Sequence, residues 1–214
     1  MADIAHPAGL IAANLLNDPA PHCHILTTTT HKTLRGPRGG IAIISKELSR
    51  KYDRGIFPMI QGGPIMNTIL AKAVAFKEAL SNDFKNYSTN IISNSKLLAK
   101  IFQEGGLRIV SGGTDNHLML LDLRNIKING SEAEEKLNSV GIIVNKNAIP
   151  FDPLPPNITS GIRVGTPAIT TRRINEEDLS TIGDLIIQTL KTPTKNLSDI
   201  KSKVSRIMQK LPLP

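Results

Sequence analysis

The stretch that decides the fold runs from Thr27 to Gly40 and reads TTTTHKTLRGPRGG. It sets a histidine, a lysine and two arginines among glycines, which suits a loop facing an anion better than a buried strand. The backbone N–H groups of Gly39 and Gly40 could approach a phosphate closely. The order of its residues is not that of a Walker A loop. Composition alone is compatible with an anion site and with a basic surface turn.

Two polar residues near the start of the chain, Asp3 and His6, give this stretch a chemical context. An acid at the end of a strand that leads into a helix can point into a ligand crevice, although such a pair alone is more typical of solvated or capping side chains. Pyridoxal phosphate chemistry needs a lysine amine and a carboxylate that keeps the pyridine nitrogen protonated. We therefore expect Asp3 and Lys32 to serve one cofactor site.

Length and composition indicate an ordinary globular protein. The chain has 214 residues, and such a length can bury a core without metal ions or disulfides. The single cysteine, Cys23, cannot form an internal disulfide, and no apolar run approaches the roughly 20 residues of a membrane span. The first residues do not resemble a signal peptide. We expect a soluble cytoplasmic protein.

The net charge of +8 is concentrated near the C-terminus. Between Lys191 and Pro214, six basic residues stand against one acid. Five apolar residues recur there at helical spacing: Leu197, Ile200, Val204, Ile207 and Leu211. This pattern predicts an amphipathic helix with lysines on its outer face. A basic nucleic-acid-binding module that uses this helix and the Arg35–Arg38 loop is the alternative function, although only 3% of the residues are aromatic.

Apolar periodicity predicts the order of the elements. In the first part we expect a helix over 7–16, strands over 24–26 and 40–44, and a helix with an apolar face of Ile69, Ala73, Phe76 and Leu80. In the second part we expect a helix after Asn82-Asp83, a strand over 118–123, a helix capped by Ser131, a strand over 142–144 and a helix starting at Asn175. The fold class is therefore α/β, with a boundary near residue 80 and an α+β unit after it.

A candidate metal cluster, His22-Cys23-His24, is the main competing motif. A zinc site would need further ligands, and neither a second cysteine nor a well-spaced histidine pair is present. We expect no metal site, and no nucleophilic role for Cys23, because the sequence places no base beside it.

Together, the motifs resemble those of the serine hydroxymethyltransferases. The resemblance begins with Asp3-Ile4-Ala5-His6 and the stretch from Thr27 to Gly40. It continues through Phe57-Pro58, QGGP at 61–64, SGGTDNH at 111–117, VNKN at 144–147 and TSGIRVGTP at 159–167. The resemblance implies a fold-type I pyridoxal-phosphate-dependent transferase. Residues 1–80 would be the C-terminal part of the large cofactor domain, at the end of its mixed sheet, and residues 81–214 the small C-terminal α+β domain.

The resemblance also implies how the cofactor would be held. Lys32 would bind it covalently, Asp3 would pair with the pyridine nitrogen, and His6 would contact the ring hydroxyl. His31 and Arg38 would lie near the cofactor. Gly62 and Gly63 would approach its phosphate across a dimer interface.

The implied reaction is that of glycine hydroxymethyltransferase in one-carbon metabolism and glycine biosynthesis: the interconversion of serine and glycine with tetrahydrofolate and methylenetetrahydrofolate. Arg163 would bind the substrate carboxylate, and Asn147 lies in the segment that contacts folate. Asn116 and His117 are expected to be structural. An aminotransferase would retain Asp3 and Lys32, but it would give no reason for Asn147 or the block that follows His31.

One departure from the family pattern concerns length. The family's chains carry a first half that holds the phosphate loop, the histidine stacked on the ring, and the acid–base glutamate and tyrosine. We therefore expect this chain to be the C-terminal half of an enzyme that is a homodimer or tetramer. We expect the 214-residue chain alone to bind the cofactor poorly, to be inactive, and to self-associate through exposed sheet edges.

Overall fold

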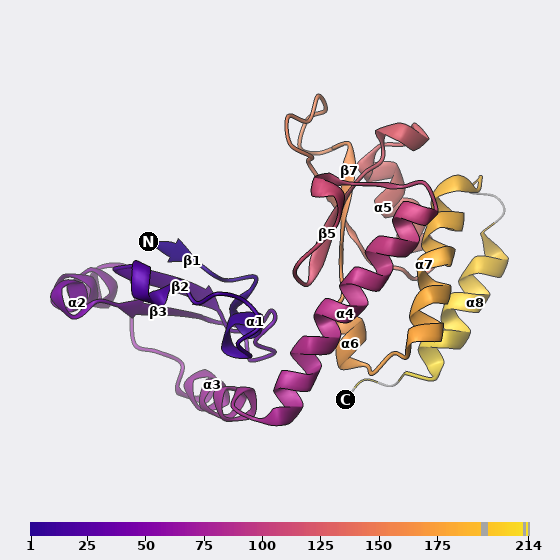
Figure 1. Cartoon of the computed structure of the whole chain (residues 1–214). Coiled ribbons are helices and arrows are strands. Elements are labelled where there is room, and N and C mark those ends of the chain that lie inside the picture. Colours follow the sequence, from indigo (N-terminus) through magenta and orange to yellow (C-terminus); the bar gives the residue numbers. More distant parts are fainter. Residues whose placement is uncertain (194–196, 212, 214) are drawn as a thin grey trace. The chain divides into compact units, whose positions relative to one another are not determined.

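The computed structural model describes residues 1–193, 197–211 and 213, and the chain forms two compact units, Met1–Thr89 and Asn90–Pro214 (Figure 1). The division falls inside one long helix, α4 (Asn82–Glu104). Each unit has its own sheet. The boundary near residue 80 that the sequence suggests stays a prediction.

The first unit contains a three-stranded mixed sheet in the order β1-β2-β3. Its strands are β1 (Ala2–Asp3), β2 (Ile25–Thr29) and β3 (Gly40–Ile44). β1 runs parallel to β2, with Asp3 opposite Thr27, whereas β3 runs antiparallel to β2. The β-branched run at 40–44 is a strand, as predicted.

Helix α1 (Ala8–Ala12) is shorter than the predicted 7–16. Asn14 adopts a left-handed backbone conformation (φ 58°), which ends the helix because a right-handed helix cannot pass through it. A short 3₁₀ turn at Ala20–His22 then leads into β2.

After the sheet come α2 (Lys46–Arg54), a π-helical turn at Gly55–Ile60, and α3 (Met66–Ala79). The sequence analysis did not predict α2. The apolar face predicted for α3 is largely exposed: only Ala75 of this helix is buried, and Leu80, just after it, is 88% exposed. Of the four residues predicted for that face, Phe76 alone is half-buried.

The second unit packs helices around an antiparallel sheet in the order β4-β5-β7-β6. The strands are β4 (Arg108–Ile109), β5 (Leu118–Asp122), β6 (Asn145–Asn147) and β7 (Gly161–Gly165). Short 3₁₀ turns lie at Val110–Gly112 and Arg124–Ile126. The remaining helices are α5 (Gly130–Ser139), α6 (Pro167–Thr171), α7 (Glu176–Lys191) and α8 (Ser198–Gln209).

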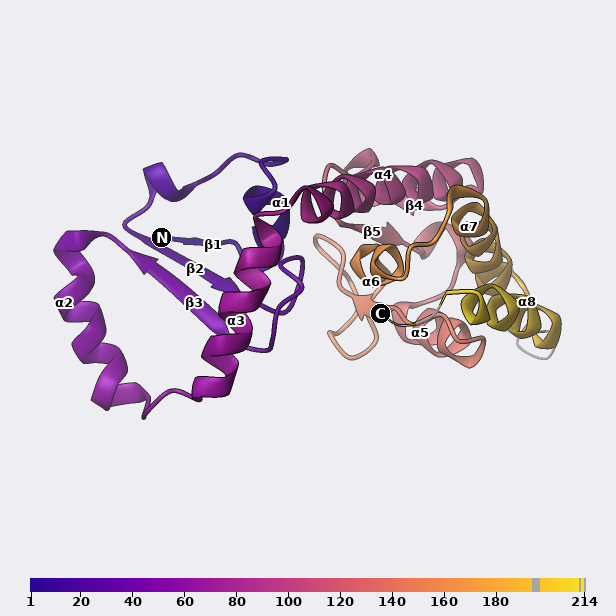
Figure 2. The ribbon, with the colours of Figure 1, turned by 90° about the horizontal axis from the view of Figure 1, so that it is seen from below.

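Helices α7 and α8 run side by side in both views (Figure 2). The predicted apolar row of α8 is buried in the core of this unit, as are Leu179, Ile182, Ile186 and Leu190 of α7. Asn175 begins α7, because its side chain accepts a hydrogen bond from the Asp178 amide at 2.7 Å. The predicted start of α7 and the amphipathic nature of α8 are confirmed.

Two local predictions in the second unit were wrong. The cap of α5 is Asn129, not Ser131: Asn129 accepts from the Glu132 amide at 2.9 Å, and the Glu132 carboxylate accepts from the Asn129 amide in return. Residues 142–144 are not a strand. Gly141 takes a left-handed conformation and the Ile142 amide bonds back to Leu137, so this segment ends α5 and leaves Ile143 85% exposed.

Candidate active site

Asp3 and Lys32 are brought to the same edge of the first sheet. Asp3 is the last residue of β1, and Lys32 follows the last residue of β2 by three positions. Because β1 and β2 are parallel, their carboxyl ends meet at one edge. The chain that leaves β1 continues along β2, with the Ile4 amide bonded to the Thr27 carbonyl at 2.8 Å. Ligands of α/β proteins commonly bind at such an edge.

Threonine hydroxyls fasten the segment after β1 to the segment after β2. Thr29 donates to the Ala5 carbonyl at 3.2 Å, and Thr33 donates to the His6 carbonyl at 2.6 Å. The Thr33 hydroxyl also accepts from the Gly9 amide at 2.9 Å. These bonds hold Asp3 to Gly9 against the residues that flank Lys32.

The loop that carries Lys32 and Arg38 closes over the buried Thr30. The Thr30 hydroxyl donates to the Pro37 carbonyl at 2.5 Å, and the Thr30 carbonyl accepts from the Gly36 amide at 2.8 Å. The Thr30 amide in turn donates to the Gly39 carbonyl at 3.0 Å. The sequence analysis did not assign a role to the threonine run. Its position at the end of a short strand, directly before a basic loop, is the signal that could have identified it.

The side chains at this edge include several groups that could hold pyridoxal phosphate. Asp3 is exposed, with one carboxylate oxygen accepting from the Ala5 amide at 2.8 Å. Lys32 and His6 are half-buried, and Arg38 is exposed. Nδ1 of His31 is buried and has no hydrogen-bond partner among the described residues. An amine, a carboxylate and an imidazole with spare bonding capacity at one edge fit the cofactor.

Gly62 and Gly63 lie in an exposed segment between the π-helical turn and α3. A Cβ at either glycine would meet no atom within 4 Å, and neither has a left-handed φ. Local packing in the described residues therefore does not require glycine at these positions. This finding is compatible with a close approach to a ligand or to another chain.

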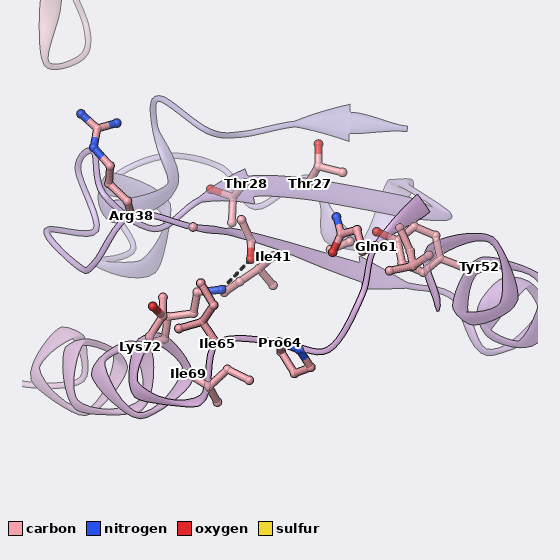
Figure 3. A pocket seen from close by; sticks show the side chains of 15 residues that line it. Thr27, Thr28, Arg38, Ile41, Tyr52, Gln61, Pro64, Ile65, Ile69 and Lys72 are labelled. Carbon is pink, nitrogen blue, oxygen red and sulfur yellow. Dashed lines mark hydrogen bonds between the residues drawn. The ribbon is translucent and has the colours of Figure 1, made fainter. Parts of the chain in front are cut away.

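A cavity of about 540 Å³ in the first unit is lined in part by Arg38, Gly39 and Gly40 of the basic loop (Figure 3). It is bounded by β2, β3 and the segment from Gln61 to Lys72. The Lys72 amine donates to the Gly40 carbonyl at 2.9 Å, whereas the Arg38 guanidinium extends away from Lys72. The Arg38 guanidinium therefore takes no part in the hydrogen bond between Lys72 and Gly40.

Arg163 and Asn147 belong to the second unit. Arg163 lies in the middle of β7, directly opposite Asn145 of β6, and its guanidinium donates to the Asn145 side-chain oxygen at 3.3 Å. Asn147 lies opposite Gly161 and donates to the Ala148 carbonyl at 2.8 Å. Since side chains alternate along a strand, Asn145, Asn147 and Arg163 share one face of the sheet. That face offers one guanidinium and two amides.

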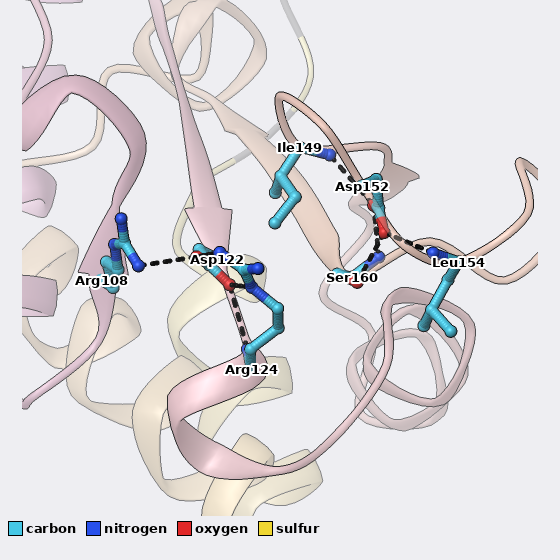
Figure 4. Close-up of polar contacts among 7 residues, drawn as sticks. All are labelled: Arg108, Asp122, Arg124, Ile149, Asp152, Leu154 and Ser160. Carbon is cyan, nitrogen blue, oxygen red and sulfur yellow. Dashed lines mark hydrogen bonds and ion pairs between the residues drawn. The ribbon is translucent and has the colours of Figure 1, made fainter.

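Asp152 fixes the connection between β6 and β7 (Figure 4). Its carboxylate accepts from the amides of Ile149, Leu154 and Ser160 at 3.1, 2.9 and 2.8 Å, and from the Ser160 hydroxyl at 2.6 Å. Burial alone would raise the pKa of Asp152, but these hydrogen bonds outweigh it and lower the pKa to about 2. The connection is thus secured three residues before Arg163. Asp152 was not predicted from the sequence as part of the site.

A second carboxylate, Asp122 at the end of β5, is buried between two arginines (Figure 4). Arg124 donates two side-chain hydrogen bonds to it, at 3.0 and 2.8 Å, and Arg108 forms an ion pair at 3.4 Å. The side-chain hydrogen bond from Arg124 is the main reason that the pKa of Asp122 is lowered. Burial of the carboxyl group acts in the opposite direction and raises this pKa. We assign it a structural role, since both arginines are already paired with it.

The remaining candidate residues have local partners. The Asn116 side chain accepts from the Leu118 amide at 3.0 Å, and the backbone of the buried His117 accepts from the Thr166 amide. His24 pairs with Glu47 at 3.6 Å on the surface.

Over the described ranges of the chain, no three histidine, cysteine or acidic side chains are grouped as metal ligands would be. In the same ranges, no helix is long and apolar enough to cross a membrane.

The mixed sheet of the first unit places the chain among the α/β proteins. The sequence model described as serine hydroxymethyltransferase matches residues 1–186 of the 214. The chain therefore belongs to the serine hydroxymethyltransferase family, and the resemblance that the motifs indicated is confirmed. The family consists of pyridoxal-phosphate-dependent transferases of fold type I.

Proposed function

We propose that this chain supplies the lysine-bearing part of a glycine hydroxymethyltransferase, which interconverts serine and glycine with tetrahydrofolate as the one-carbon carrier. The observation that carries the proposal is that Asp3 and Lys32 lie at one edge of two parallel strands in a member of this family. In this interpretation, residues 1–80 are part of the cofactor domain and residues 81–214 are the small domain.

The first unit would hold the cofactor. Bound pyridoxal phosphate supplies an electron sink for breaking the bond to the hydroxymethyl carbon of serine. Lys32 binds the cofactor covalently through its amine, and the Asp3 carboxylate keeps a proton on the pyridine nitrogen. His6 contacts the ring hydroxyl. Four further residues complete this group: His31, Arg38, Gly62 and Gly63.

The second unit would bind the reactants. Arg163 holds the carboxylate of serine or glycine, because a guanidinium can give a carboxylate two parallel hydrogen bonds. The 3.3 Å bond to Asn145 occupies only one of its five donors. Asn147, on the same face, contacts tetrahydrofolate, which accepts the released one-carbon unit.

The exposed surface of the first unit supports the proposal that the active enzyme needs further polypeptide. In the described part of the chain, β1 and β3 each pair along one edge only, and apolar side chains around α3 are exposed. Both features are typical of surfaces that another chain or segment covers. We propose a cytoplasmic homodimer or tetramer as the complete enzyme, and no serine–folate turnover by the 214-residue chain alone.

Trapping the cofactor with borohydride tests the assignment of Lys32. A full-length version of the protein is incubated with limiting pyridoxal phosphate and reduced, and the labelled lysine is identified by peptide mapping. We expect preferential labelling of Lys32, loss of that label in Lys32→Gln, and no loss in Lys77→Gln, a change on the exposed part of α3. Preferential labelling of any other lysine would overturn the assignment. No comparison supports the nucleic-acid-binding alternative.

A further inference from the structure

The loop that carries Lys32 and Arg38 contains a third cation, Arg35, whose role differs from theirs. Its guanidinium carbon lies 4.3 Å from the centre of the Tyr87 ring, a cation–π distance. Tyr87 is buried on α4, where its ring also packs against Phe84, with 5.8 Å between the ring centres. Arg35 is therefore committed to an aromatic ring, whereas Arg38 points elsewhere.

The backbone of Arg35 sets the turn after Lys32. Its φ of 55° lies in the left-handed region, which a residue with a Cβ adopts only against a steric cost. In this conformation the Arg35 amide donates to the Lys32 carbonyl at 2.9 Å. The next residue, Gly36, donates to the Thr30 carbonyl at 2.8 Å. The peptide of Lys32 thus depends on a strained turn that must be stabilised from outside.

Two contacts provide this stabilisation. On one side, a Cβ at Gly36 would come within 3.2 Å of the Ala75 methyl group, so the loop lies directly against α3. On the other side, the Arg35 side chain rests on Tyr87 of α4. The α3 contact involves backbone and a methyl group only. Tyr87 is therefore the side chain that favours this turn through Arg35.

We propose that Tyr87 is a positioning residue for Lys32: it binds the Arg35 guanidinium and so stabilises the left-handed turn from which the cofactor lysine projects. Of the two arginines in the loop, only Arg38 then remains for the cofactor phosphate. The inference rests on the proposed function in so far as Lys32 is the cofactor lysine.

The contact itself can be tested without any cofactor. The chain has no tryptophan and only two tyrosines, Tyr52 and Tyr87, so Tyr52→Phe leaves one tyrosine as an NMR reporter. In that background, Arg35→Met should shift the Tyr87 ring resonances and speed hydrogen exchange at the Arg35 and Gly36 amides. Arg35→Lys, which retains a cation, should have a smaller effect. Unchanged Tyr87 ring signals and unchanged amide hydrogen exchange in a folded Arg35→Met variant would refute the proposal.

The effect on Lys32 is tested in the full-length protein by borohydride trapping across a pH series, with labelling of Lys32 expressed relative to Lys77. Tyr87→Phe keeps the ring and should keep the Lys32 labelling ratio of the parent protein. Tyr87→Leu should lower the ratio by about two- to fivefold, as loss of a cation–π contact predicts, and shift its pH midpoint. A fall in stability with an unchanged ratio and midpoint would mean a merely structural role and would overturn the proposal. If Lys32 of the full-length parent protein is not labelled, the proposed function fails, while the exchange experiment still decides the role of Tyr87.

Discussion

The hydroxyl of Thr33 joins the two segments of the candidate cofactor site: it donates to the His6 carbonyl at 2.6 Å and accepts from the Gly9 amide at 2.9 Å. These partners lie 27 and 24 positions away in the chain. Thr33 is buried and adjacent to Lys32. Together with Thr29, this side chain thus holds the Asp3–His6 segment next to the segment that carries the lysine.

Removal of this hydroxyl should destabilise the first unit. Thr33→Val keeps the volume but leaves the buried Gly9 amide without its partner, which should lower the free energy of unfolding by about 1–3 kcal/mol. Thr33→Ser keeps both hydrogen bonds and should cost less. Urea unfolding followed by circular dichroism measures both. Equal stability of the valine and serine variants would show that the hydroxyl is not the stabilising group.

Two glycines should respond in opposite ways to alanine. At Gly9, a Cβ would lie 2.2 Å from the Thr33 carbonyl oxygen, a backbone atom that cannot move away, so Gly9→Ala should strongly destabilise the first unit. At Gly63, a Cβ would meet nothing within 4 Å, so Gly63→Ala should leave the unfolding midpoint unchanged.

The same Gly63→Ala variant separates packing from ligand binding. If Gly63 approaches the cofactor phosphate in the assembled enzyme, the variant in the full-length protein should bind pyridoxal phosphate more weakly, at unchanged stability. Equal cofactor affinity measured by absorbance titration would remove Gly63 from the site.

The sequence predicted those elements whose stability comes from a single apolar face. The rows on α7 and α8 are read directly from spacing, and the run Gly40–Ile44 is read from its β-branched residues. Local hydrogen bonds decided the places where the prediction was wrong. Asn129 rather than Ser131 caps the start of α5, and Gly141 turns the chain after that helix so that the Ile142 amide bonds back to the Leu137 carbonyl. Such choices depend on backbone geometry that periodicity does not record.

In the candidate site, the residues with specific chemistry were predicted from the sequence, whereas the residues that hold them in place were not. Asp3, Lys32 and Arg163 were identified by residue type and motif, because their chemistry is specific. The residues that hold them, Thr33 and Asp152, were missed, since a hydroxyl or carboxylate that bonds to backbone leaves no periodic pattern in the sequence. Their partners become evident only once segments distant in the chain are placed side by side.

Asp152 should make the second unit sensitive to acid. Its pKa in the folded protein is about 2, below the ordinary 3.8, so its contribution to stability is complete above pH 3.8 and is lost as the pH falls towards 2. Asp152→Asn should therefore lower the urea midpoint at neutral pH, and this deficit should shrink over that interval. Asp184→Asn, an exposed position on α7, is the matched control. A deficit that is independent of pH would indicate a steric effect.

The two arginines around Asp122 should contribute unequally. Arg124 donates two side-chain hydrogen bonds to Asp122. The exposed Arg108 side chain comes no closer than 3.4 Å to the Asp122 carboxylate. Arg124→Met should therefore reduce the urea midpoint more than Arg108→Met does, because it leaves the buried carboxylate with one distant side-chain partner and the backbone amide of residue 124. A larger effect of Arg108→Met would reverse this assignment.

The exposed apolar face of α3 should drive self-association of the 214-residue chain. Met66 and Leu70 are 66% and 69% exposed, and their spacing of four places them on one side of the helix. Met66→Lys with Leu70→Lys should shift the protein towards monomer in sedimentation velocity at moderate salt, because charged side chains resist burial at an interface. The control, Asn67→Lys with Ala71→Lys, adds the same charge to exposed positions of α3 while both apolar side chains remain. It should associate like the parent chain. If the control dissociates as fully as the test variant, charge repulsion rather than the apolar face governs association. A parent chain that is monomeric even at high concentration would contradict the prediction.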